Sequence, residues 1–400
     1  MKLHPRPVLL SLVSAGLLIL LSVLVIAKVT VTSNEKPPTL FTEEAESVEL
    51  AAKLGQSLII GIPGPTLDPA TQNILERLKP AGIVLYQWNY SSDEQLKKLI
   101  NDLQAVSLKT SGLPLFIMTD AEPDGAIRFG LFQNAFRNGV PDWKVIGKDA
   151  ARLKQLGINV DLAPPTDFPF RPDAPASRWQ LQRFHNPSEL MLFNRQFIKV
   201  LNEHGVLTVL KHFPGGGLLA GDPHDSLPQG QTEPEKLAAS LDLFRDGLKS
   251  GASLVMTYHG RYDELDAEHI ATLSPTIIQQ LLQNQLGFKG LTLTDDLSEM
   301  VAVAKAGQVK RLRGVYERYG GKHEGVYNEA AGLARVGTEA LLAGHQLIMF
   351  SHWLNNTAES FELMLQTAGR NAELEQRLND NYKLIKEFKQ QRLKLLVPNI

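Results

Sequence analysis

The sequence predicts an α/β fold, a (β/α)8 TIM-type barrel that follows an N-terminal transmembrane helix. Eight short apolar runs recur along the chain, helical patterns lie between them, and twenty uncharged residues stand near the N-terminus. Strands that alternate with helices are typical of a parallel sheet, and eight such units close a barrel. A doubly wound open sheet is the alternative, but the only run of three glycines, 215–217, follows Lys-His-Phe-Pro instead of opening a helix.

The uncharged N-terminal run covers residues 8–27. About twenty helical residues cross a hydrocarbon core of about 30 Å. Lys2 and Arg6 precede the run, and positive flanks favour the cytoplasmic side. We therefore expect residues 1–33 to form a cytoplasmic stub and an uncleaved, single-pass anchor in the inner membrane, with the body on the periplasmic side. A cleaved signal peptide is the alternative, although the run is long and no clean Ala-x-Ala site follows it.

The predicted strands are four to six residues long and apolar on both faces, as parallel strands covered on both sides are. In chain order they are residues 57–62, 83–86, 115–119, 159–163, 206–211, 253–258, 291–294 and 346–350. Helical spacing of apolar residues is clear over 94–107, 187–204 and 275–286.

Three boundaries follow from these patterns. Residues 34–48 are polar and contain Pro37-Pro38, which predicts a linker. Residues 49–355 form the barrel, the single catalytic domain. Residues 356–400 carry a charged amphipathic pattern, which predicts one C-terminal helix packed on the barrel.

The composition excludes several classes of protein. The 400 residues are 43% hydrophobic and 21% charged, which is typical of a globular protein. A net charge of −2 offers no basic footprint for nucleic acid, so no nucleic-acid partner is expected. The absence of cysteine excludes disulfides, a thiol nucleophile and thiolate metal sites. The oligomeric state stays open.

Polar residues capable of chemistry follow the last apolar residues of four predicted strands. They are Asp120, Lys211, His212, His259, Asp295 and Asp296. The active sites of such barrels lie at the carboxyl ends of the strands, where these side chains would converge. The positions therefore predict an active site at the mouth of the barrel.

Three motifs carry a resemblance to a known family. Residues 211–224 read Lys-His-Phe-Pro-Gly-Gly-Gly-Leu-Leu-Ala-Gly-Asp-Pro-His, residues 293–298 read Leu-Thr-Asp-Asp-Leu-Ser, and residues 120–129 read Asp-Ala-Glu-Pro-Asp-Gly-Ala-Ile-Arg-Phe. In type and order they resemble the motifs of glycoside hydrolase family 3, especially its compact bacterial β-N-acetylhexosaminidases. The resemblance extends over about residues 50–352.

The resemblance implies a retaining exo-β-glycosidase, most closely a β-N-acetylhexosaminidase that releases N-acetylglucosamine from peptidoglycan-derived or chitin-like saccharides. Asp295 stands at the nucleophile position and would form a covalent glycosyl-enzyme. His224 would act as the acid/base, and Asp222 would orient its ring. Neither a cofactor nor a metal is expected. The alternative is that Asp295 or Asp296 only caps the following helix and that the segment with Asp222 and His224 is a surface turn.

The resemblance also assigns substrate-binding residues at the sugar hydroxyls. They are Asp120, Arg128, Lys211, His212, Arg183 and His259. Arg178 competes with Arg183 for the position of a further family arginine. His259 fits equally well as a buried supporting residue, and Asp167 is similar.

Departures from the family pattern leave the specificity open. Gly216 replaces the second histidine of Lys-His-Phe-Pro-Gly-His-Gly, and Pro-Asp-Gly at 123–125 replaces Gly-Gly-Arg. An insertion at 305–328 carries six basic residues and three tyrosines. It is expected either to bind an anionic part of a substrate or to form a solvated loop.

Four alternatives remain. Two keep the chemistry: a β-glucosidase-like enzyme and a phosphorylase. A third is an inactive, membrane-tethered sugar-binding barrel. The fourth is a metal hydrolase built on His212, Asp222, His224 and His259, which no metal-ligand spacing supports.

Overall fold

The computed structural model describes residues 40–393 apart from 124–127, 176–182, 307–329 and 353. Ser47–Ile400 forms one compact unit that contains the barrel. The predicted anchor at 8–27 lies outside the described residues, as does nearly all of the insertion at 305–328. Among the described helices, none is long and apolar enough to cross a membrane.

Eight parallel strands close into a barrel in the order β1-β12-β11-β9-β7-β6-β3-β2. The strands are β1 (Leu58–Gly61), β2 (Gly82–Leu85), β3 (Phe116–Thr119), β6 (Val160–Asp161), β7 (Leu207–Phe213), β9 (Leu254–Thr257), β11 (Leu291–Asp296) and β12 (Leu347–Phe350). Each predicted apolar run supplies one of them, so the predicted TIM-type class is confirmed.

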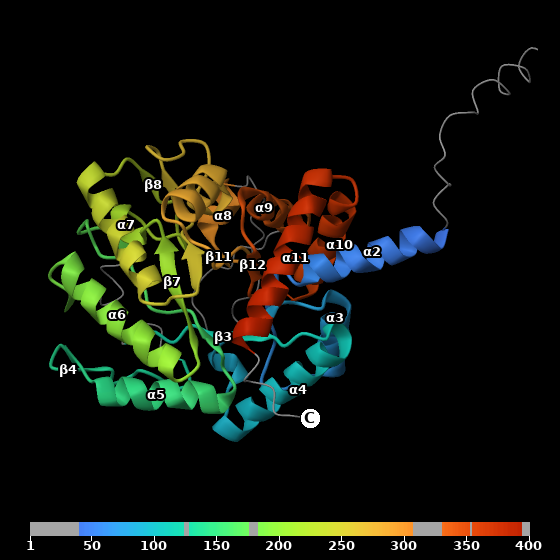
Figure 1. Ribbon diagram of the computed structural model, residues 1–400, viewed down its shortest axis with the longest axis horizontal. Helices are drawn as coiled ribbons and strands as arrows, with labels where there is room; N and C mark the ends of the chain where they lie inside the picture. The colour runs from blue at the N-terminus through green and yellow to red at the C-terminus, as the bar shows by residue number, and fades with distance from the viewer. Residues whose placement is uncertain (1–39, 124–127, 176–182, 307–329, 353, 394–400) are drawn as a thin grey trace, which may run out of the picture. The chain divides into compact units, whose positions relative to one another are not determined.

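Helices surround the strands, and α4, α5, α6 and α7 follow one another around the barrel (Figure 1). The helices are α2 (Leu40–Gly55), α3 (Pro69–Leu78), α4 (Asp93–Ser111), α5 (Trp143–Leu156), α6 (Pro187–Glu203), α7 (Pro234–Lys249), the π-helix η6 (Thr276–Gln285), α8 (Val301–Ala306), α9 (Ala330–Ala343), α10 (Leu354–Ala368) and α11 (Ala372–Arg392). Short 3₁₀ turns are η1 (Gln87–Asn89), η4 (Gly216–Leu218) and η5 (Ala271–Leu273). Outside the barrel, β4 (Phe136–Arg137) pairs with β5 (Val140–Pro141), and β8 (Gln229–Gly230) pairs with β10 (Arg261–Tyr262).

Side-chain caps explain where several helices begin. The Ser92 hydroxyl accepts a hydrogen bond from Gln95 N at the start of α4, and Asn186 caps α6 directly before Pro187. Helix α5 ends at Gly157, whose φ of 92° lies in the left-handed region that glycine adopts without a steric penalty. The caps therefore set the lengths of the helices that lead into the strands.

The core has two layers because alternate strand residues point to opposite faces. Ile60 and Leu85 belong to the outer cluster, which packs under the helices. The inner cluster fills the barrel itself and includes Ile59, Val84, Phe116, Met118, Val160, Val209, Met256, Leu293 and Met349. The barrel is therefore a packed core, and only its rim is free for chemistry.

Helix α11 covers the amino-terminal end of the barrel. Buried Lys389 donates to Gln56 Oε1 at 2.9 Å and to Ala81 O at 2.8 Å, just before β1 and β2. Phe388 meets the edge of Phe116 with ring centroids 6.0 Å apart, and Asn381 donates to His345 O before β12. This leaves the carboxyl end of the barrel for the site.

Two predicted boundaries differ from the structure. Helix α2 begins at Leu40, inside the predicted linker. Near its C-terminal end, Leu50, Ala51 and Leu54 pack against the core, and this contact stabilises the helix. The predicted C-terminal helix is two helices, since Asn371 caps a new helix by accepting from Leu374 N. Helix α11 contacts the barrel through Lys389, Phe388 and Asn381.

Candidate active site

Lys211 lies at the centre of the first cluster, near the end of β7. Its ammonium donates to Asp120 Oδ1 at 2.5 Å and to Glu122 Oε1 at 2.6 Å, and only 4% of the side chain is exposed. Burial disfavours the charge, but the two carboxylates outweigh it and raise the pKa of Lys211. Burial acts in the same way on Asp120, where Lys211 and Arg128 prevail and lower the pKa. The ammonium and the two carboxyl groups offer hydrogen-bond donors and acceptors, which are the groups that can bind sugar hydroxyls.

The two predicted arginines lie on different parts of the rim. Arg128 Nη2 is 3.7 Å from Asp120 Oδ2, and its guanidinium lies 5.6 Å from the ring centroid of Tyr86. Arg128 therefore belongs to the Lys211 cluster, and its predicted role as a sugar contact stays a prediction. The Arg183 guanidinium stacks 3.8 Å from the Phe136 ring centroid in the β4–β5 hairpin. Its role as a sugar contact stays a prediction, and Arg178 lies outside the described residues.

His212 joins two carboxylates from opposite sides. Its Nδ1 is 2.7 Å from Asp167 Oδ2, and its Nε2 is 3.4 Å from Asp295 Oδ2. Burial disfavours the imidazolium, but Asp167 and then Asp295 outweigh it and raise the pKa of His212. The predicted nucleophile Asp295 is thus paired with a histidine that tends to be charged, and its Oδ1 accepts from Asp296 N at 2.8 Å.

The predicted dyad is formed on the loop after β7. His224 Nδ1 lies 2.7 Å from Asp222 Oδ1, and the same oxygen accepts from His224 N at 3.0 Å. Burial opposes the charged ring, but the hydrogen bond and the charge of Asp222 raise the pKa of His224 to about 9, with Asp295 and Glu299 adding to the effect. The imidazole is 54% exposed. A proton held on an accessible ring is what a general acid requires.

The loop that carries Asp222 and His224 (the dyad loop) is contacted by α8 and by Tyr258, which follows β9. Ala302 N, at the start of α8, donates to Pro223 O at 3.0 Å. The Tyr258 hydroxyl points at Gly221 O at 3.4 Å. A Cβ added at Gly216 would meet Tyr258 Cε2 at 2.9 Å, so the tyrosine ring occupies space next to the position where the family motif has its second histidine.

His259 lies in a supporting position, and its predicted role as a sugar contact stays a prediction. The residue is fully buried, with Nδ1 2.7 Å from Thr272 Oγ1 and Nε2 3.1 Å from Asp296 O. Burial lowers the pKa of His259, so the ring tends to be neutral. It supports the backbone beside the nucleophile, which is the other interpretation that the sequence allowed.

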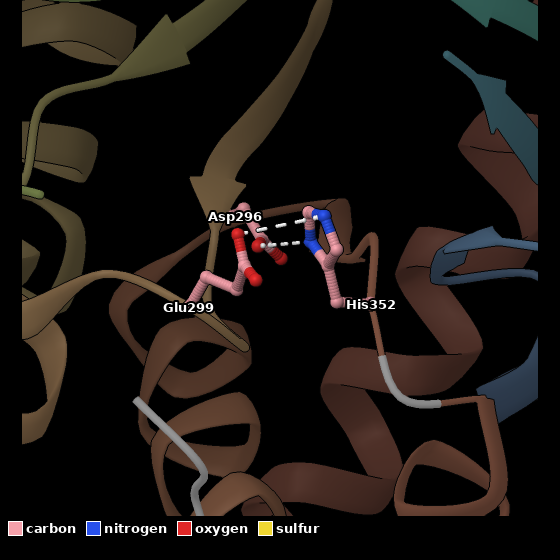
Figure 2. Close-up of side chains that lie close together, drawn as sticks. All are labelled: Asp296, Glu299 and His352. Atoms are coloured by element: carbon pink, nitrogen blue, oxygen red, sulfur yellow. Dashed lines mark hydrogen bonds and ion pairs between the residues drawn. The ribbon is translucent and has the colours of Figure 1, made fainter. Parts of the chain in front are cut away.

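A third cluster lies behind the nucleophile, where His352 faces Asp296 and Glu299 (Figure 2). His352 Nδ1 is 3.1 Å from Asp296 Oδ2, whereas Nε2 is 3.4 Å from Glu299 Oε2. Burial disfavours the charge on Asp296, but His352 and Ser298 outweigh it and lower the pKa of Asp296 to about 2. Asp296 also accepts from Ser351 N at 2.9 Å.

The ligand atoms of this third cluster lie within 4.8 Å of one another, which is compact enough to consider a metal ion. However, the ring of His352 presents a different nitrogen to each carboxylate, and one ion can bind only one of these two nitrogens. The arrangement fits a row of polar contacts from Asp296 through His352 to Glu299, which holds the turn after β11 in place. Asp296 is therefore a structural anchor, in contrast to its neighbour Asp295.

No role was predicted for Glu122, Glu299 or His352, and Asp167 was left open, like His259, between a place in the site and a buried supporting role. Glu122 could have been found because it stands two residues after Asp120 in the same motif. His352 lies two residues after the end of β12, and Asp120 directly follows β3, so the position near a strand end was the available signal. For Glu299, three residues after Asp296, the chain position alone does not show which way the side chain points.

Known proteins are similar to this chain in sequence and in fold. A model described as the glycosyl hydrolase family 3 N terminal domain matches residues 49–316. The beta-hexosaminidase A of Pseudoalteromonas piscicida is 30% identical over 260 residues, covering 58% of this chain and 43% of that protein. The beta-hexosaminidase of Stenotrophomonas maltophilia (strain K279a) is 28% identical over 275 residues, covering 63% and 77% respectively. This chain therefore spans less than half of the first relative.

Among solved structures, a glycoside hydrolase family 3 beta-N-acetylglucosaminidase from Paenibacillus sp. str. FPU-7 is 25% identical with a TM-score of 0.70. The match covers 88% of this chain and 64% of that chain. The family model and the relatives place this barrel in the class of glycoside hydrolases. Within that class, because the family model matches more than half of its length, this chain belongs to glycosyl hydrolase family 3.

Proposed function

We propose that the chain is a retaining exo-β-N-acetylhexosaminidase that releases N-acetylglucosamine from cell-wall-derived saccharides. The proposal rests above all on Asp295, a carboxylate with one oxygen held by a backbone N–H and the other paired with His212. Such a carboxylate can attack an anomeric carbon and form a glycosyl ester. The relatives named as beta-hexosaminidases support the choice of sugar.

In the first step, Asp295 Oδ2 or Oδ1 bonds to the anomeric carbon while the bond to the leaving oxygen breaks. His224 gives its proton to that oxygen, which departs as an alcohol. Lys211, Asp120 and Arg128 hold the sugar hydroxyls during the attack. The raised pKa of His224 keeps the ring protonated at neutral pH, as this step requires.

In the second step, His224 takes a proton from water, and the water oxygen displaces the Asp295 carboxylate from the anomeric carbon. The charge of Asp295 is one cause of the raised pKa of His224. An ester carries no such charge, so the pKa of His224 falls once the intermediate forms. The same residue thereby becomes a better base when a base is needed.

The assay that tests the proposal compares aryl N-acetyl-β-glucosaminide with aryl β-glucoside, with and without a chelator. We expect hydrolysis of the first, little of the second, and no effect of chelation. A preference for the β-glucoside would favour the β-glucosidase alternative, and turnover that needs phosphate would favour a phosphorylase. Loss of activity with chelator would favour a metal hydrolase. Tight sugar binding without turnover would favour an inactive sugar-binding barrel.

We also propose that residues 8–27 anchor the enzyme in the inner membrane, with the barrel on the periplasmic side. The length of the uncharged run and its basic flank support this topology. Fractionation and protease treatment of spheroplasts test it. Full-length protein in the membrane fraction, cleaved by external protease, is expected. A soluble cytoplasmic pool of intact protein would contradict the topology.

A further inference from the structure

The inference concerns Asp167, which follows β6 and touches neither the nucleophile nor the dyad. All of its hydrogen bonds to described residues go to the segment that carries His212. Its carboxylate accepts from His212 N at 3.0 and 3.1 Å and from Gly216 N at 2.6 Å, and it meets His212 Nδ1 at 2.7 Å. Only 8% of the Asp167 side chain is exposed, against 23% for the His212 ring.

This contact pattern fixes the orientation of the ring. The backbone N–H and the Nδ1 of His212 are bound by the same carboxylate, so the ring cannot turn without losing that hydrogen bond. The other nitrogen, Nε2, is then directed across the mouth of the barrel toward Asp295 Oδ2. In the barrel, β7 lies between β6 and β9, and β9 lies next to β11, so the three residues span four neighbouring strands.

We propose that Asp167 is a positioning residue which, through His212, holds the nucleophile Asp295 in its reactive orientation and assists its departure in the second step. The inference rests on the proposed glycosidase function. A carboxylate on Nδ1 stabilises the imidazolium, as it does in other carboxylate–histidine pairs. The imidazolium then faces the negative charge that Asp295 regains when the glycosyl ester breaks.

Other ionisable groups also face the His212 ring and enter its charge balance. Lys211 opposes the positive ring, and the Tyr258 ring lies beside it with centroids 6.0 Å apart. The remaining groups that sense its charge are Asp120, Glu122 and His259. Asp167 differs from all of them because it alone is hydrogen-bonded to the ring.

The decisive variant is Asp167→Asn, which keeps the size and an acceptor oxygen but removes the charge. The pKa of His212 should fall in the variant, so the positive ring is lost at lower pH. We expect kcat/KM to fall roughly 100-fold at neutral pH, and its alkaline limb to move down by about one pH unit or more. An aryl glycoside with an activated leaving group is the substrate, because its departure does not need the proton of His224.

NMR titration of the histidine rings provides a readout that does not depend on turnover, with the His212 signal assigned by its loss in His212→Gln. In the wild-type protein His212 should titrate above an ordinary histidine, and in Asp167→Asn below the wild type. A His212 that is neutral at pH 7 in the wild type would overturn the proposal even if the variant failed to fold. Equal titration in the two proteins would overturn it as well.

The matched control is Asp266→Asn. Asp266 has a similar set of contacts, accepting from Ser274 Oγ and from the N–H groups of Glu268 and His269, but it contacts no residue of the site. Its replacement should change thermal stability without moving the pH limb. A shifted His212 titration with an unchanged limb in Asp167→Asn would reject the role in the reaction. A wild-type protein that cleaves no glycoside but shows the shifted titration would reject the proposed function and keep the geometric pairing.

Discussion

The residues of the site owe their protonation states to particular neighbours. Asp222 raises the pKa of His224 and two carboxylates raise that of Lys211, whereas burial lowers the pKa of His259. Of these three basic side chains, His224 and Lys211 therefore tend to be charged, whereas His259 tends to be neutral. This explains how histidines of the same barrel can serve as an acid on a loop and as a neutral support in the interior.

The first prediction concerns His224→Ala. Substrates with poor leaving groups should lose about 10²- to 10⁴-fold in kcat/KM, because their oxygen departs only with a proton. An activated aryl glycoside should lose far less in its first step, and azide should restore part of its turnover. Steady-state kinetics on an alkyl and an aryl glycoside make the comparison. Equal losses on both substrates with no rescue by azide would rule out His224 as the acid/base.

The second prediction concerns Asp222→Asn. The acid must be protonated, so the activity of the wild type on an alkyl glycoside should decline as the pH rises through about 9. Without the charge of Asp222 the pKa of His224 falls toward an ordinary value, and the alkaline limb should move to lower pH. The pH–rate profile of kcat/KM measures this directly. A limb that stays in place would mean that another group carries the proton.

At this scale the sequence predicted the identity of the main groups but not all of their contacts. Asp295, His224 and Asp222 stand at family positions. The structure pairs His224 with Asp222 as the resemblance implied, whereas the contact between Asp295 and His212 was not predicted. The sequence left open whether His259 is buried or reaches the sugar, because its partners Thr272 and the Asp296 carbonyl come from other parts of the chain. The order of residues along a chain does not show which atoms of neighbouring strands meet.

At the scale of elements, two strands carry the chemistry beyond their apolar runs. Strand β7 continues through Lys211 and His212 to Phe213, and β11 continues through Asp295 to Asp296. Both are longer than the apolar runs that predicted them. Polar residues can stay in an extended strand when their side chains contact the ends of neighbouring strands. A pattern of hydrophobic residues alone does not reveal such an extension.

The third prediction concerns Gly216 and Tyr258. The added side chain in Gly216→His would collide with the Tyr258 ring, which approaches the position of a Cβ to 2.9 Å. We expect Gly216→His to lower the free energy of unfolding by about 1–3 kcal/mol and to displace the dyad loop. The double variant Gly216→His with Tyr258→Ala should recover part of the loss. Thermal melting and kcat of the two variants provide the test, and additive losses would contradict steric coupling.

At the scale of the whole molecule, the amino-terminal end of the barrel contributes to stability, and the carboxyl end holds the candidate active site. Helix α11 covers the amino-terminal end, and the ionisable clusters gather at the carboxyl end. The sequence predicted that the C-terminal region packs on the barrel, but not that it divides into two helices or which end it covers. The division depends on the Asn371 cap, and the end that is covered depends on buried Lys389 and its acceptors far away in the chain.

The fourth prediction concerns Lys389→Met. Burial holds the pKa of Lys389 well below its usual range. Between that lowered pKa and about 10.4 the unfolded chain binds the extra proton, so the contribution of Lys389 to folding rises with pH. The difference in unfolding free energy between wild type and Lys389→Met should therefore change in favour of the wild type by up to about 1.4 kcal/mol per pH unit. Denaturant unfolding at pH 7, 8 and 9 measures it, and a difference independent of pH would refute the explanation.

The central claim, a covalent intermediate on Asp295, is tested most directly by trapping it. A fluorinated N-acetylglucosaminyl fluoride forms the glycosyl ester rapidly and hydrolyses slowly, so the ester accumulates. Peptide mass spectrometry of the trapped enzyme should locate the sugar on the peptide that contains Asp295, and Asp295→Asn should remain unlabelled with turnover reduced by at least about 10³-fold. A label on any other residue, or Asp295→Asn with near-normal turnover, would contradict the assignment of the nucleophile.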